Sequence, residues 1–199
     1  MCWIAVLFQV NPRWPLLVAA NRDESRQRPT RAPFRWPEDP PLWAGRDEVA
    51  GGTWLGVNGA GLLAAVTNRP EADVDTARRS RGLLCLDCLR CASPATARVF
   101  VADELTRRRY NALNLLCANP DEGWVASGPG DIRTLTPGVH VLSNFGELDD
   151  DRLPVVREVR DRVAALPLDA PDVETLLDGL GRVCAATDGA VPLCRAGGG

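Results

Sequence analysis

The chain contains no lysine, and all 23 of its basic residues are arginine. This absence excludes a lysine nucleophile and a lysine Schiff base. Asp and Glu total 26, so the formal net charge is −3. Phosphate binding needs a clustered excess of positive charge, and this mild acidity therefore argues against nucleic acid as the main partner.

No apolar run approaches the ~20 residues that a membrane span requires. The apolar opening, residues 2–10, has no basic stretch before it and no small-residue cleavage site after it. We therefore expect no membrane span and a cytoplasmic protein. The seven cysteines fit this expectation, because their number is odd and they form no secreted-type framework.

Length and composition predict ordinary globular structure. The 199 residues are 45% hydrophobic and 25% charged, and a domain of this size buries a core without metal or disulfide staples. We expect one domain over residues 1–187, followed by an atypical glycine-rich tail over 188–199.

The order of apolar runs and turn residues predicts an α+β fold with mainly antiparallel sheets. Strands are expected at 2–10, 16–20, 51–58, 61–67, 113–118, 124–127, 132–135 and 139–143. Helices are expected at 82–92, 94–109, 154–165 and 171–186. Residues 25–46, rich in Arg, Pro and Trp, predict a long ordered loop.

Cys2 is the first candidate for chemistry. Processing that removes Met1 would give Cys2 a free α-amine, whose ordinary pKa of about 7.7–8.0 leaves part of it neutral at physiological pH. Such an amine can take the proton of its own thiol, so nucleophile and base share one residue. The alternative is that Cys2 only begins a buried strand.

Several ordered motifs resemble the NRDE-motif family, the "transport and Golgi organisation" or Tango type. They are Met1-Cys2, Leu17–Glu24, Ala44–Asp47, Gly51–Val57, Thr67-Asn68, Ser80–Gly82, Tyr110–Leu116 and Pro137–Asn144. The resemblance implies the fold of N-terminal-nucleophile hydrolases, an α+β sandwich of two antiparallel sheets flanked by helices.

A more distant likeness to the cholylglycine-hydrolase-like branch of those enzymes implies roles for single residues. Asn21-x-Asp23, the segment from Gly61 to Asn68, and Asn144 are similar to elements of that branch. By this analogy Asp23 holds the α-amine, Asn68 donates a hydrogen bond to the oxyanion, and Asn144 orients the amine or the substrate. The alternative is structural: Asn68 ends a strand at a turn, Asn144 caps a loop, and Asn21 and Asp23 bond within a buried corner.

Arg22 and Glu24 alternate along the chain with Asn21 and Asp23, so in a strand they would point to the opposite face. We expect them to form an ion pair there with Arg46 or Asp47. The family resemblance also implies further strands with a Tyr-Gly-Thr-Arg-Ser-Ser-like segment after the last helix. This chain ends without that segment, so we expect the C-terminal strands to be missing.

Other chemical signals are weaker. Cys85, Cys88 and Cys91 have the spacing C-x₂-C-x₂-C, but on a helix they spread over more than one face with no fourth ligand nearby, so we interpret them as core residues and expect no metal. His140, the only histidine, is either a packed residue or an axial haem ligand. Trp36 and Trp43 are candidates for lining an apolar pocket.

The leading hypothesis is an N-terminal cysteine hydrolase that acts on an amide or thioester of an acyl-type small molecule and needs no cofactor. The alternative, implied by the family resemblance, is a non-catalytic protein that binds or traffics haem or acyl-coenzyme A. In that case the ligand is haem-like or acyl-like and the Trp-rich and Arg-rich segments hold it.

Overall fold

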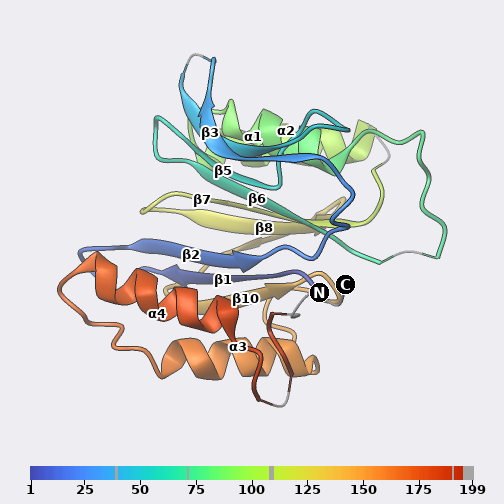
Figure 1. Ribbon diagram of the computed structural model, residues 1–199. Coiled ribbons are helices and arrows are strands. Elements are labelled where there is room, and N and C mark those ends of the chain that lie inside the picture. Colours follow the sequence, from blue (N-terminus) through green and yellow to red (C-terminus); the bar gives the residue numbers. More distant parts are fainter. Residues whose placement is uncertain (39, 71, 108–109, 190, 195–199) are drawn as a thin grey trace. The chain divides into compact units, whose positions relative to one another are not determined.

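The computed structural model describes residues 1–199 except 39, 71, 108–109, 190 and 195–199 (Figure 1). The chain divides into two compact units. The first unit comprises Met1–Asp23 and Thr136–Gly199, and the second comprises Glu24–Leu135. Each unit contains an antiparallel sheet and two helices that pack on one face of that sheet (Figure 1).

The first unit contains a three-stranded sheet in the order β10-β1-β2. Its strands are β1 (Trp3–Phe8), β2 (Leu16–Asn21) and β10 (Gly138–Ser143). Trp3 at the start of β1 lies opposite Asn21 and Ser143, the last residues of β2 and β10. Because both pairings are antiparallel, the residue before β1 meets the residues that follow β2 and β10 at one end of this sheet.

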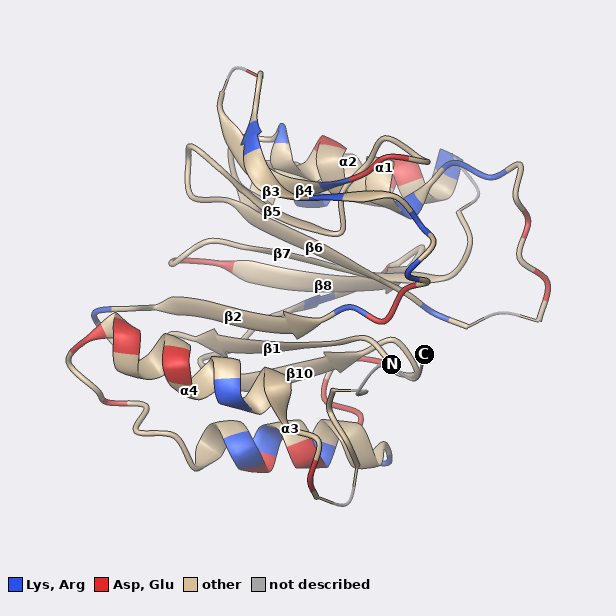
Figure 2. Cartoon of the chain, in the orientation of Figure 1, with Lys and Arg blue, Asp and Glu red and all other residues tan. Residues whose placement is uncertain are grey.

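Two helices, α3 (Pro154–Ala164) and α4 (Val173–Ala185), cover this sheet (Figure 1). The α3 valines at 155, 159 and 163 recur every four residues and are buried, which is the pattern of an amphipathic helix. They pack with Trp3, whose side chain has no exposed surface. None of the charged residues of these two helices is buried, and Figure 2 marks their positions along both ribbons.

The second unit contains a seven-stranded antiparallel sheet in the order β3-β4-β5-β6-β7-β8-β9. Its strands are β3 (Thr30–Trp36), β4 (Leu42–Asp47), β5 (Leu55–Asn58), β6 (Leu63–Asn68), β7 (Leu113–Ala118), β8 (Gly123–Gly128) and β9 (Asp131–Thr134). Helices α1 (Arg81–Leu89) and α2 (Pro94–Arg107) pack on it. The side chain of Ser80 caps α1 by accepting a hydrogen bond from the N–H of Gly82.

The prediction of a long loop over residues 25–46 is wrong, because this stretch contains the hairpin of β3 and β4. Trp36 is buried in the core, and its indole N–H donates to the carbonyl of Ala44 at 3.0 Å. Strand β3 is at the edge of its sheet, and Pro33 lies where the β3–β4 register shifts between Arg31 and Phe34. An edge strand tolerates this proline and exposed arginines, which together hid its alternation in the sequence.

Most other elements lie where the sequence predicts them. Helix α1 ends at Leu89, earlier than the expected residue 92. The expected end of α2 at residue 109 lies outside the described chain, which gives α2 as Pro94–Arg107. Among the described residues, no helix is both long enough and apolar enough to span a bilayer. The boundary of a single domain at residue 187 stays a prediction, and half of the expected glycine-rich tail, residue 190 and residues 195–199, is outside the described chain.

Candidate functional site

Cys2 lies at the end of the first unit's sheet, directly before β1. Its sulfur accepts a hydrogen bond from the backbone N–H of Asp23, with a donor–acceptor distance of 3.2 Å, and lies 3.7 Å from the carbonyl oxygen of the same residue. A thiol that exchanges its proton can therefore donate to the carbonyl, and a thiolate can accept from the N–H. Both contacts are with the Asp23 backbone, and the Cys2 side chain is only half-buried.

The Asp23 carboxylate binds the N-terminal ammonium group of Met1. The Met1 side chain is 17% exposed and that of Asp23 is 45% exposed. The Asp23 carboxylate therefore holds the Met1 amine, while the Asp23 N–H and carbonyl both contact the Cys2 sulfur. Removal of Met1 would free this carboxylate and convert the peptide nitrogen of Cys2 into an α-amine.

Asn144 contacts Cys2 through both of its polar groups. Its side-chain oxygen accepts the Cys2 N–H at 3.0 Å, and its own backbone N–H donates to the Cys2 carbonyl at 3.1 Å. Asn144 directly follows β10, so the antiparallel pairing of β10 with β1 places it there. The sequence candidates Cys2, Asp23 and Asn144 are thus brought together, and their catalytic roles stay predictions.

Asn21 ends β2 and binds a different segment. Its side-chain amide donates to the carbonyls of Cys184 and Leu193, each at 2.8 Å. It therefore fastens residues 192–194 beside the start of the chain. A pocket of about 150 Å³ results, lined by Met1, Asn21, Arg22, Asp23, Pro192, Leu193 and Cys194.

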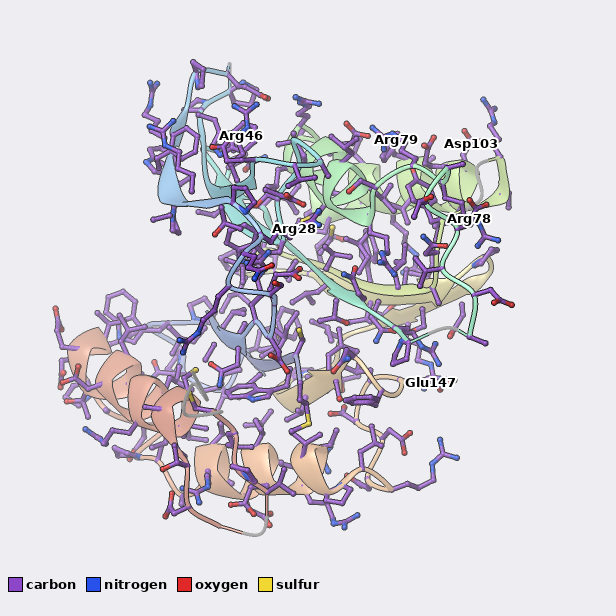
Figure 3. All side chains as sticks on the ribbon, turned by 45° about the vertical axis from the view of Figure 1, so that its right-hand side comes forward. Arg28, Arg46, Arg78, Arg79, Asp103 and Glu147 are labelled. Carbon is purple, nitrogen blue, oxygen red and sulfur yellow. The ribbon has the colours of Figure 1, made fainter. Side chains whose placement is uncertain are left out.

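Arg22 lines this pocket in the first unit, whereas Glu24, Arg46 and Asn68 lie in the second unit. Asn68 is the last residue of β6 and is exposed. Its role as an oxyanion donor stays a prediction. Arg46 pairs with Glu48 at 3.6 Å, and Asp47 pairs with Arg28 at 2.7 Å. The ion pair expected of Arg22 and Glu24 with Arg46 or Asp47 stays a prediction. Figure 3 labels Arg28, which precedes β3, and Arg46, which lies in β4.

His140 does not offer a nitrogen to haem. Its Nδ1 lies 2.7 Å from an Asp149 carboxylate oxygen, and its Nε2 lies 2.7 Å from the Thr136 carbonyl. The expected apolar pocket of Trp36 and Trp43 is also not formed, because Trp36 is a core residue while Trp43 is 44% exposed. Within the described residues, no group of His, Cys, Asp and Glu could hold a metal ion.

Comparison with known sequences decides the family. The sequence profile described as "Transport and Golgi organisation 2" matches residues 1–188. The chain belongs to this family. It is 30% identical over 155 residues to the human Transport and Golgi organization protein 2 homolog and 32% identical over 158 residues to the bovine one. Each match covers 70% of this chain and 56% of the relative, so the chain spans about half the length of these relatives.

Solved structures show the fold of this Transport and Golgi organisation 2 family member. An N-acylethanolamine-hydrolyzing acid amidase ortholog from Caenorhabditis elegans superposes with a TM-score of 0.52 at 9% identity, covering 90% of this chain and 85% of that chain. Penicillin V acylase from Agrobacterium tumefaciens gives a TM-score of 0.53 at 12% identity, covering 92% and 72%. The expected α+β fold of the N-terminal-nucleophile hydrolase type is confirmed.

Two features of the site are missing from the sequence analysis. Residues 192–194 form one wall of the pocket, and no local pattern in the sequence indicates this, because bonds from distant residues such as Asn21 and Trp3 hold them there. The second feature is the pairing of His140 with Asp149, which also pairs with Arg160. The sequence does contain a signal for this pairing. An acidic run at residues 147–151 follows His140, the only histidine, and a carboxylate of such a run can pair with an imidazolium.

The cysteines provide a test of the site's accessibility. Burial raises the pKa of the Cys85 and Cys117 thiols well above the ordinary value and that of Cys91 to about 11. At pH 8 a pKa of about 11 leaves about a thousandth of a thiol as thiolate, the reactive form. We expect iodoacetamide to modify Cys2 in the folded protein while Cys85 and Cys117 stay unmodified, as measured by peptide mass mapping. All seven should react in denaturant, and modification of Cys85 as fast as Cys2 in the folded state would contradict this.

Proposed function

We propose that this protein is an N-terminal cysteine hydrolase that cleaves an amide or thioester of an acyl-type small molecule once Met1 has been removed. One observation carries the proposal. The Cys2 sulfur lies between the N–H and the carbonyl of Asp23, the Cys2 nitrogen is bonded to Asn144, and the Asp23 carboxylate binds the amine at the chain's start. Nucleophile, base position and orienting groups are therefore adjacent in one unit.

The chemistry follows from these contacts. The α-amine of Cys2 accepts the thiol proton, and the sulfur attacks the acyl carbonyl carbon to form a tetrahedral intermediate. The bond to the leaving nitrogen or sulfur breaks while the ammonium returns the proton to it, and water then hydrolyses the thioester to release the acid. The Asp23 N–H stabilises the thiolate at 3.2 Å, and the Asn144 oxygen orients the amine.

The pocket beside Met1 is the proposed substrate site. With Met1 in place this pocket has a volume of about 150 Å³, and its lining combines apolar Pro192 and Leu193 with polar Asp23. Removal of Met1, itself a lining residue, would open this space further. The role of Asn68 as the oxyanion donor is implied only by the distant likeness to the cholylglycine-hydrolase-like branch. The acyl-handling proteins named above share the fold, which is consistent with hydrolysis but does not fix the substrate.

The test compares two forms of the chain. One begins at Cys2, with the loss of Met1 verified by intact mass, and the other keeps Met1 behind a short Gly-Ser extension. Both are mixed with p-nitrophenyl esters of acetic, hexanoic and decanoic acids. We expect the chain that begins at Cys2 to gain one acyl mass and to release nitrophenol in a burst, because only this form has a base beside its thiol.

Cys184→Ala is the matched control, since Cys184 is a half-buried thiol of the same unit whose side chain is outside the pocket lining. It should leave the acyl mass unchanged, while Cys2→Ala should remove it. Equal acylation of the extended chain, or acylation that survives Cys2→Ala, would overturn the proposal. Binding of haem or acyl-coenzyme A that is the same with and without Cys2, together with no acylation, would instead favour a carrier.

A further inference from the structure

The segment that follows β10, residues 144–149, folds back onto the strand it has just left; we call it the 144–149 loop. Leu148 forms a bridge with Leu142, and the N–H of Asp149 donates to the Val141 carbonyl at 2.9 Å. Asp149 adopts φ = 60°, in the left-handed region that residues other than glycine seldom occupy. Such a conformation persists where the surrounding contacts hold it.

Three groups hold the Asp149 carboxylate. One oxygen accepts the Val141 N–H at 2.8 Å and lies 3.0 Å from the Arg160 guanidinium of α3. The other oxygen lies 2.7 Å from Nδ1 of His140. Since Nε2 of His140 faces the Thr136 carbonyl at 2.7 Å, both ring nitrogens face acceptors, and only the protonated ring donates to both.

The loop connects these charges to Cys2. Asn144, its first residue, accepts the Cys2 N–H at 3.0 Å and donates its own N–H to the Cys2 carbonyl at 3.1 Å. Asp149, its last residue, is fastened to β10 and α3 by the contacts just described. The loop is therefore fixed at both ends, by Cys2 at one and by His140 and Arg160 at the other.

We propose that His140, Asp149 and Arg160 are positioning residues that hold Asn144 against Cys2, so that the arrangement of the Cys2 site depends on the protonation of His140. This inference rests on the proposed function, because it assigns a regulation to that site. None of the three residues is hydrogen-bonded to Cys2, and they act through the 144–149 loop, in addition to the β10–β1 pairing that places Asn144 beside Cys2.

The sign of the pH dependence follows from the charges around the ring. The hydrogen bond to Asp149 raises the pKa of His140, against burial and the charge of Arg160, which lower it. Asp149 and Arg160 are the charged groups that act on the ring in the described chain, and its β1 neighbour Val6 is apolar. The stabilisation from His140 is therefore complete below its ordinary value of 6.5 and is lost as pH rises through the raised pKa.

The Asp149 carboxylate sets the lower limit of the pH range in which the 144–149 loop is held. Burial raises its pKa, but hydrogen bonds from His140 and the Val141 N–H outweigh burial and leave the pKa below the ordinary 3.8. Its contribution is present above 3.8 and is lost as pH falls through the lowered pKa. The loop is thus held most firmly between about pH 3.8 and pH 6.5, and loosens above that range.

The first measurement does not need turnover. In the ¹⁵N-labelled chain that keeps Met1, hydrogen exchange of the Cys2 amide reports its bond to Asn144, and the His140 ring signals report its titration. We expect the protection of the Cys2 amide to fall about ten-fold as His140 loses its proton, after correction for intrinsic exchange, because hydrogen bonds of a charged group are lost.

His140→Gln keeps a donor without a titration, and Asp149→Asn keeps a residue that tolerates positive φ. Each should remove the pH step in Cys2 protection, while Arg152→Gln, at an exposed ion pair with Asp150, should keep it. A pH step that persists unchanged in both loop variants overturns the inference.

The second measurement separates this inference from the proposed function. The rate of acylation of the chain that begins at Cys2 is followed against pH in the wild type and in His140→Gln. A step at the His140 pKa that the variant loses supports both proposals. Acylation whose pH profile is unchanged in His140→Gln overturns the positioning role alone, whereas absent acylation with a normal pH step in Cys2 protection overturns the hydrolase alone.

Discussion

Cys2→Ala in the chain that begins at residue 2 is expected to lower kcat/KM for an activated acyl ester by on the order of 10³-fold or more, because the nucleophile and its route through a thioester are lost. The alanine keeps the α-amine and its Asn144 partner, so the substitution removes the sulfur and little else. Initial rates of nitrophenol release over a range of ester concentrations give kcat/KM for the parent and for the variant.

Asp23→Asn serves as the graded comparison. The asparagine keeps the backbone contacts to the Cys2 sulfur but removes the carboxylate that holds the amine. We expect an intermediate loss of about 10²-fold, in the range of a misplaced general base. Cys184→Ala should stay within two-fold of the parent. Turnover in Cys2→Ala equal to the parent would place the chemistry elsewhere or nowhere in this chain.

Gly52→Ala is expected to destabilise the second unit by about 3 kcal/mol, because it forces a side chain into backbone that has no room to move. A Cβ at Gly52 would lie 2.3 Å from the Gly82 carbonyl carbon and 2.5 Å from the Leu83 nitrogen. The neighbouring Thr53 N–H donates to the Gly82 carbonyl at 3.0 Å, which keeps the two segments in contact. A thermal midpoint lower by on the order of 10 °C would measure the effect.

Gly181→Ala is the matched control for this substitution. Gly181 lies in α4, where an added Cβ meets no atom within 4 Å, and alanine is the better helix former. We expect stabilisation by up to about 1 kcal/mol. If Gly52→Ala unfolds at the same temperature as the parent, the close approach at the start of α1 is not what limits the second unit's stability.

Cys2, Asp23 and Asn144 are candidates from the sequence that the structure brings together, but the contacts that each of them makes were not predictable. Asp23 was expected to act through its carboxylate, and it does hold an amine, yet its backbone N–H and carbonyl also bracket the Cys2 sulfur. Asn21 belongs to the same Asn21-x-Asp23 motif, but its side-chain amide donates hydrogen bonds to the carbonyls of Cys184 and Leu193. Backbone atoms carry no sequence signal, since every residue has them.

The missed hairpin has a related cause. Sequence alternation identifies a strand where one face is buried, and Phe34 and Trp36 do point to the core. The proline and arginines of β3 broke that pattern because an edge strand pairs on one side only and exposes its other side. Only the pairing with β4 shows that this stretch is part of the sheet.

The sequence by itself determined the family motifs, the apolar strands and helices, and the presence of a thiol at position 2, since these depend on residue type and local spacing. The tertiary structure alone decided that Asn144 meets Cys2, that residues 192–194 line the pocket, and that His140 is bound on both nitrogens. These contacts join residues 4 to 172 positions apart in the chain. Most of them depend on strand register and helix packing, which local sequence does not specify.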